Sequence, residues 1–152
     1  MAYLQFLDGK DKPDPQFWQK NNASPRLNAW RGFAFEELCF AHVAQIKQKL
    51  GIASVSTTES SWVVESRERK HQIDLLIDRA DNVINLCEIK FYGKPFSIDA
   101  KYGAELRERV QTLMDKVPQK KSIHLTLIAT YGLKPNENSG QVQSVVSLDD
   151  LF

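Results

Sequence analysis

Residues 72–90, QIDLLIDRADNVINLCEIK, contain two apolar segments that are separated by a short polar turn. Strand-forming residues on both sides of residues 79–82 predict a β-hairpin. Three charged side chains, Asp74, Glu88 and Lys90, stand where a hairpin made for burial would have apolar residues. These charges therefore need an explanation, either structural or chemical.

The hairpin brings the three charges close together. Side chains alternate across a strand, so Glu88 and Lys90 project from one face. Pairing the strands symmetrically about the turn places Asp74 opposite residues 87–88. Two carboxylates this close repel, and one takes up a proton unless a cation lies between them. Because Mg²⁺ and Mn²⁺ bind through one or two carboxylates with water and substrate phosphate, the pattern predicts a divalent-cation site.

The alternative interpretation is an ion pair of Lys90 with Asp74 or Glu88 at the end of a strand. An ion pair that buries an additional carboxylate is a poor stabiliser, since desolvation of each ion costs several kcal/mol. This cost favours a functional interpretation.

Hydrophobic periodicity predicts the remaining elements. Helical spacing of apolar residues predicts a helix over 32–50, which Gly51 ends. A second helix is predicted from an N-cap at Asp99 to about Val117. Three further strands are predicted, near 60–66, 122–130 and 141–148. The order helix, three strands, helix, strand, strand predicts an α/β (α+β) fold with a central mixed sheet flanked by helices.

The chain has 152 residues, of which 42% are hydrophobic and 26% are charged, as is typical of one soluble globular domain. No apolar run approaches the roughly 18–20 residues that span a bilayer, so no membrane association is expected. The net charge of +1 neither favours nor excludes nucleic acid as a partner. Cys39 and Cys87 lie in apolar segments and are predicted to be buried thiols, which favours a cytoplasmic location.

Residues 1–29 differ from the rest of the chain. They contain three of the six prolines, Pro13, Pro15 and Pro25, and show no clear periodicity. An extended arm or linker is therefore predicted here, with the domain proper occupying residues 30–152. The aromatic side chains of the arm are expected to pack on this domain or on a neighbour, as in a fragment of a longer chain.

An acidic residue on the first predicted helix extends the charge pattern. Glu36 flanks the apolar side of that helix, although a glutamate in a first turn also favours the helix dipole. Together with the three hairpin charges it completes an E…D…ExK pattern. From about Trp30 to Thr130 the chain resembles the PD-(D/E)XK nuclease superfamily, whose restriction-endonuclease-like core has the order α-β-β-β-α-β. The superfamily motif has proline before the aspartate, where this chain has Ile73.

A second resemblance covers nearly the whole chain. Segments that look like AWRGFAFEELCFAH (29–42), SWVVES (61–66), the hairpin and the closing LDDLF (148–152) occur in the same order in the nuclease-like C-terminal domain of certain prokaryotic AAA-type ATPases. This resemblance implies that the domain normally follows an ATPase region. No Walker-type phosphate-binding motif occurs in these residues, so they are not themselves the ATPase.

The resemblance implies a role for each charged residue. It implies that Asp74 and Glu88 bind Mg²⁺ or Mn²⁺, together with the backbone carbonyl of Ile89. It implies that Lys90 positions or activates the attacking water, and that Glu36 is an auxiliary acidic residue of the active site.

A nuclease must also hold a polyanion. Residues 101–121 contain six Lys/Arg and three acidic side chains, which favours salt-sensitive contacts with phosphates. The alternative is a solvated helix face with i,i+4 ion pairs such as Glu105–Arg109. The candidate nucleic-acid contacts in this segment are Lys101, Tyr102, Arg107 and Arg109.

The leading prediction is a Mg²⁺- or Mn²⁺-dependent DNA endonuclease-like domain that is attached to, or derived from, an AAA-type ATPase. The alternative is a non-catalytic module that couples the ATPase to DNA or protein and keeps an idle acidic pocket. A third hypothesis is a homo-oligomerisation domain that associates through residues 1–29.

Overall fold

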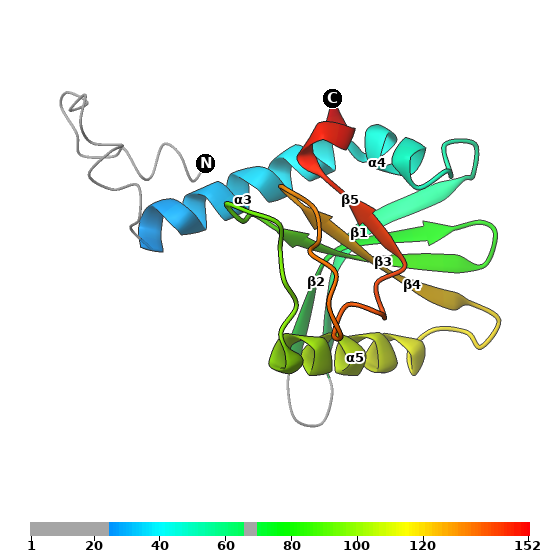
Figure 1. The fold of residues 1–152 in the computed structure, drawn as a ribbon. Helices are drawn as coiled ribbons and strands as arrows, with labels where there is room; N and C mark the ends of the chain where they lie inside the picture. The colour runs from blue at the N-terminus through cyan, green and yellow to red at the C-terminus, as the bar shows by residue number, and fades with distance from the viewer. Residues whose placement is uncertain (1–24, 66–69) are drawn as a thin grey trace, which may run out of the picture. The chain divides into compact units, whose positions relative to one another are not determined.

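The structure is a computed structural model that describes residues 25–65 and 70–152 (Figure 1). The chain divides between Ala41 and His42 into two compact units. Helix α3 (Pro25–Ala41) belongs to the first unit, and the second contains all the strands. Residues 1–24 of the predicted arm lie outside the described residues.

The helix that was expected over 32–50 starts earlier than predicted and is interrupted, whereas its end just before Gly51 agrees with the prediction. It begins at Pro25, so residues 25–29 are helical rather than extended. Proline suits the start of a helix, where its missing N–H has no partner to lose. The helix is also interrupted at His42, whose backbone (φ −118°, ψ 30°) is not helical, and α4 (Val43–Lys49) continues beyond it.

Five strands form one mixed sheet in the order β1-β2-β3-β4-β5. Their bounds are β1 (Thr57–Glu65), β2 (Lys70–Arg79), β3 (Val83–Lys90), β4 (Ser122–Ala129) and β5 (Ser144–Val146). The first three strands are an antiparallel meander, and β4 and β5 run parallel to β3. The predicted mixed sheet with flanking helices is confirmed. The last strand is shorter than predicted, and the chain ends in the 3-10 helix η1 (Leu148–Leu151).

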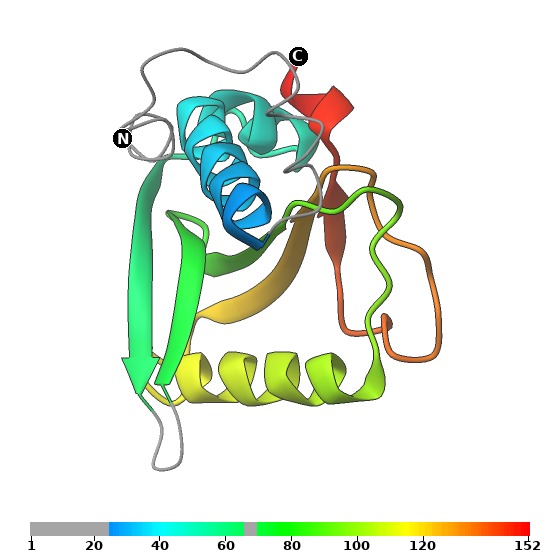
Figure 2. The same cartoon turned by 90° about the vertical axis from the view of Figure 1, so that its left-hand side faces the viewer.

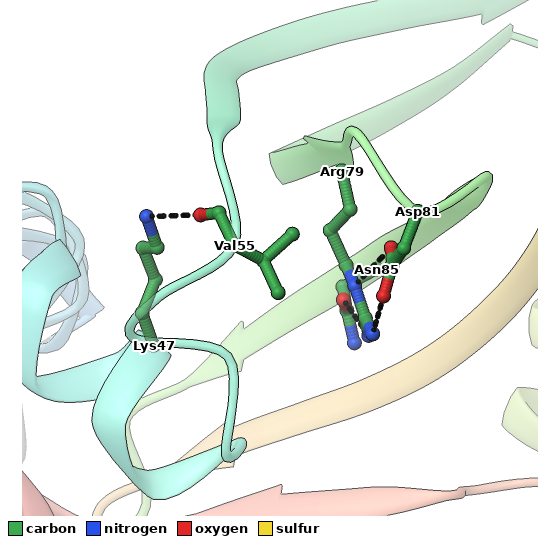
Figure 3. Close-up of polar contacts among 5 residues, drawn as sticks. All are labelled: Lys47, Val55, Arg79, Asp81 and Asn85. Carbon is green, nitrogen blue, oxygen red and sulfur yellow. Dashed lines mark hydrogen bonds and ion pairs between the residues drawn. The ribbon is translucent and has the colours of Figure 1, made fainter.

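The turn between β2 and β3 is fixed by local polar contacts. Asn82 has a positive φ of 64°, a conformation that asparagine tolerates better than most residues. Arg79 donates two hydrogen bonds to Asp81, at 2.9 and 2.6 Å, and one to the Asn85 Oδ1 at 3.2 Å (Figure 3). The turn thereby sets the register of the hairpin.

Figure 3 also shows a contact outside this turn, in which Lys47 Nζ donates a hydrogen bond to the Val55 carbonyl.

Helix α5 (Ala100–Met114) crosses from β3 to β4 and covers one face of the sheet (Figure 2). It encloses a core of eight buried apolar residues, namely Ile73, Leu76, Ile84, Leu86, Ile98, Leu106, Leu113 and Leu125. The predicted N-cap is confirmed, because the Asp99 side chain accepts a hydrogen bond of 2.7 Å from the Tyr102 N–H. The helix ends three residues before the predicted Val117.

Loss of this cap should destabilise the second unit. Asp99→Ala is expected to lower the free energy of unfolding by about 1 kcal/mol, because one N–H of the first turn loses its acceptor. Urea denaturation measures the effect, and Asp99→Ser, which can still cap, serves as the control. Equal destabilisation by alanine and serine would contradict this role.

Cys39 and Cys87 are buried thiols, as predicted. Within residues 25–65 and 70–152, no helix is long and apolar enough to cross a membrane.

Candidate active site

The hairpin register brings the two predicted carboxylates together. Leu75 of β2 lies opposite Cys87 of β3, so the adjacent residues Asp74 and Glu88 stand side by side on the same face. The Ile89 N–H donates a hydrogen bond of 3.0 Å to Asp74 Oδ2, which ties the carboxylate to β3. The predicted proximity of Asp74 to Glu88 is thus confirmed.

Two side chains of helix α5 contact the second carboxylate, Glu88. Glu88 is buried, with 2% of its surface exposed. Arg109 forms a short ion pair with Glu88 Oε1, and the Tyr102 hydroxyl donates a hydrogen bond of 3.3 Å to Oε2. Both oxygens of Glu88 therefore have partners from α5.

The predicted lysine belongs to the same cluster. Lys90 Nζ lies 4.7 Å from the centroid of the Tyr102 ring, a cation–π distance. Tyr102 thus contacts Glu88 through its hydroxyl and Lys90 through its ring. Five residues, Asp74, Glu88, Lys90, Tyr102 and Arg109, form what we call the charged cluster.

Burial dominates the electrostatics of the cluster. It raises the pKa of Glu88, an effect that Arg109 offsets only in part and that the negative charge of Asp74 reinforces. Burial also raises the pKa of Asp74, against the hydrogen bond from Ile89 and the charges of Lys90 and Arg109. The pKa of Tyr102 is raised by burial and by the Glu88 charge, so its hydroxyl remains protonated and donates.

The oxygen atoms of this site are of the type that binds a hard divalent cation, but the charge of Glu88 is already neutralised by Arg109. Carboxylate oxygens of Asp74 and Glu88 and the Ile89 carbonyl are the ligand type that Mg²⁺ and Mn²⁺ prefer. However, the cation that the sequence required beside Glu88 is the Arg109 guanidinium. Among the described residues there is no group of three acidic, histidine or cysteine side chains that could hold a metal ion. A metal held by Glu88 would therefore have to displace Arg109.

Two atoms of the cluster have spare hydrogen-bonding capacity. The described residues give Asp74 a hydrogen bond at Oδ2 but none at Oδ1. The buried Nε of Arg109 also has no hydrogen-bond partner among them. These two atoms leave one acceptor and one donor of the charged cluster without a hydrogen bond from the described residues.

Comparison with known proteins gives information about the fold but not about the function. No protein-family model matches the chain, and no curated protein is similar to it in sequence. A solved structure of similar fold is AF1548, a protein of unknown function, with a TM-score of 0.51 and 14% sequence identity. The alignment covers 75% of this chain and 64% of that one, so the chain spans less than two thirds of the length of AF1548.

The other predicted residues lie elsewhere. Glu36 is half-buried on α3, in the first compact unit, and its auxiliary role stays a prediction. Lys101 and Arg107 are exposed on α5, outside the charged cluster. Arg109 pairs with Glu88 inside the charged cluster, and its contact with nucleic acid stays a prediction.

The pairing of Arg109 with Glu88 was not predicted from the sequence. A signal for it exists in the spacing, since Arg109 follows Tyr102 by two helical turns and lies on the same side of α5. Only the position of the helix over β3 turns that spacing into a contact.

Proposed function

We propose that the chain is a metal-dependent phosphodiester hydrolase that acts on nucleic acid through Asp74, Glu88 and Lys90. The observation that carries the proposal is the convergence of a buried carboxylate, a half-buried carboxylate and an amine on adjacent strands. Burial raises the pKa of both carboxyl groups, so keeping them ionised costs stability. Such a cost is typical of sites where the charges are used in chemistry.

Each residue of the proposed site has a defined task. Asp74, whose Oδ1 accepts no hydrogen bond from the described residues, would hold Mg²⁺ or Mn²⁺ with the Ile89 carbonyl, and Glu88 would join once released by Arg109. Such an ion neutralises charge on the phosphate and lowers the pKa of bound water. Lys90, held over the Tyr102 ring, would place a positive charge beside the phosphate and orient the attacking water.

DNA is the proposed substrate because of the sequence resemblance to the nuclease superfamily. The same resemblance supports an AAA-type ATPase as the partner, a cytoplasmic location and an auxiliary role for Glu36.

One observation favours a second candidate function. Both oxygens of Glu88 already have partners in Arg109 and Tyr102, so the fold holds this carboxylate without a metal ion. A nuclease-like module that mediates DNA or protein contacts for the ATPase would need nothing more. The two functions differ in metal affinity, because a module of this kind does not have to bind Mn²⁺ through Asp74.

Cleavage by the wild-type protein separates the two. We expect nicking of supercoiled plasmid and cutting of single- and double-stranded oligonucleotides in Mn²⁺ or Mg²⁺, and none in EDTA. Asp78→Asn is the matched control for a substitution at Asp74, since Asp78 lies on the same strand, β2, but pairs with Lys121 at 2.6 Å. Cleavage that persists in EDTA would contradict the proposal. Absence of both cleavage and Mn²⁺ binding would favour the interaction module.

A further inference from the structure

Two loops of similar sequence follow the two central parallel strands. After β3 the chain reads Tyr92-Gly93-Lys94-Pro95, and after β4 it reads Tyr131-Gly132-Leu133-Lys134-Pro135. Neither residues 91–98 nor residues 131–136 contain an acidic side chain. We call these two segments the paired loops. Each of them supplies an aromatic ring and a lysine.

The paired loops lie side by side (Figures 1 and 2) and are joined to each other by backbone hydrogen bonds. Phe96 N–H donates to the Gly132 carbonyl at 2.9 Å, and Lys134 N–H donates to the Phe96 carbonyl at 2.8 Å. The Tyr92 N–H also donates to the Thr130 hydroxyl at 3.2 Å. Because β3 and β4 are parallel, both loops leave the same edge of the sheet. The two lysines therefore belong to one surface.

That surface is hollowed and basic, and exposed aromatic rings belong to the same two loops. A hollow of about 490 Å³ is lined by Lys94, Pro95, Ser97, Leu133 and Lys134. Three aromatic side chains of the paired loops are exposed: Phe91 by 44%, Tyr92 by 41% and Tyr131 by 59%. Large apolar rings are costly to leave in water, and two lysines in segments that contain no acidic residue favour an anionic ligand.

A row of aromatic contacts connects this surface with the charged cluster. The ring of Tyr92 meets that of Phe96 edge-on at 5.6 Å, and Phe96 meets Tyr102 edge-on at 5.7 Å. Tyr102 in turn binds Glu88 and lies beneath Lys90. The surface of the paired loops therefore adjoins the charged cluster.

We propose that the paired loops bind a nucleic-acid single strand, with Lys94 and Lys134 at its phosphates and Tyr131 stacked on a base. The binding itself is independent of hydrolysis, but delivery of the strand to Asp74 and Glu88 rests on the function proposed above. Basic grooves with exposed aromatic rings hold single strands because every base offers a face for stacking.

A single strand fits this surface better than a duplex. Bases in a duplex are stacked on each other and expose no face to a protein ring, whereas unpaired bases do. With only two lysines, the paired loops also lack the many phosphate contacts from which duplex binding draws its affinity.

The test is fluorescence anisotropy in EDTA, with labelled oligo(dT), oligo(rU), a duplex and a base-free deoxyribose-phosphate strand as probes. We expect the wild-type protein to prefer the single strands, and the comparison of dT with rU assigns DNA or RNA. Lys94→Gln/Lys134→Gln should weaken binding about tenfold and reduce the salt slope by about 1.4, the value for two lost phosphate contacts with a single strand. Tyr131→Ala should weaken binding at least about fivefold, while Tyr131→Phe, which keeps the ring, should not.

The matched control is Lys116→Gln/Lys120→Gln. These exposed lysines lie between α5 and β4, at the opposite edge of the sheet from the paired loops. An equal loss in this control would overturn the proposal, as would equal binding of the base-free strand, preference for the duplex, or no binding by the wild-type protein. Strand binding without cleavage in Mn²⁺ would remove the proposed hydrolase and leave the paired loops as a binding surface. Cleavage in Mn²⁺ that the loop variants leave unchanged would instead overturn the paired loops as the binding surface and leave the proposed hydrolase in place.

Discussion

Arg109→Met is expected to lower the free energy of unfolding by about 3–5 kcal/mol at neutral pH. Arg109 is the ion-pair partner of Glu88, whose side chain is 3% exposed. Methionine keeps the apolar stem but removes the guanidinium, which leaves a buried carboxylate with only the Tyr102 hydroxyl as donor. Urea denaturation with an unchanged m-value would measure the loss.

The size of this loss should depend on pH. Burial places the pKa of Glu88 above its ordinary value of 4.5, so the folded state binds more protons than the unfolded state between those two values. Stability accordingly falls as the pH rises through that interval. Arg109 lowers the pKa of Glu88, and its removal widens the interval. The destabilisation by Arg109→Met should therefore be larger at about pH 8 than at about pH 5.

Two controls separate the ion pair from general damage to α5. Arg107→Met changes an exposed arginine of the same helix and should alter stability by no more than about 0.5 kcal/mol. Combining Arg109→Met with Glu88→Gln removes the uncompensated charge, so the double variant should be more stable than Arg109→Met alone by at least about 1 kcal/mol. A loss below about 1 kcal/mol in Arg109→Met would show that the pair does not carry this energy.

The hairpin was predictable because its determinants are local. Alternation of apolar residues and the turn at residues 79–82 specify the register, and the register alone places Asp74 beside Glu88. The N-cap at Asp99 was predictable for the same reason, since a capping side chain bonds within its own first turn.

Contacts made across the crossover were not predictable. The sequence of α5 contains several Lys and Arg side chains, and nothing local distinguishes the half-buried Arg109 from the exposed Arg107. Arg109 and Arg107 differ only because the helix packs on the sheet in an orientation that brings Arg109 into contact with Glu88. The break at His42 was missed as well, because no glycine or proline marks it.

Asp74→Asn is expected to reduce metal-dependent cleavage at least about a hundredfold, because loss of a charged ligand removes several kcal/mol of transition-state stabilisation. The substitution is nearly isosteric. Asparagine can still accept the hydrogen bond that the Ile89 N–H donates to this side chain, so the hairpin should keep its geometry. Plasmid nicking in Mn²⁺ measures the change, with Asp78→Asn as the control on the same strand.

The same variant should not lose stability. Burial raises the pKa of Asp74 above its ordinary value of 3.8, so the ionised form is less favourable in the folded protein than in the unfolded chain. At neutral pH this carboxylate therefore lowers the free energy of unfolding, and a neutral amide relieves that cost. We expect Asp74→Asn to unfold at the same or a higher urea concentration than the wild type.

The two readouts together decide what the carboxylate is for. A variant that is inactive and at least as stable shows that Asp74 is kept at the expense of the fold, as a group used in chemistry would be. A variant that is destabilised shows instead that the negative charge of Asp74 stabilises the fold, through its attraction to Lys90 and Arg109. A variant that cleaves like the wild type places the reaction elsewhere. The described residues donate to both oxygens of Glu88 but to only one oxygen of Asp74, so Asp74 is the side chain on which the proposed hydrolase depends.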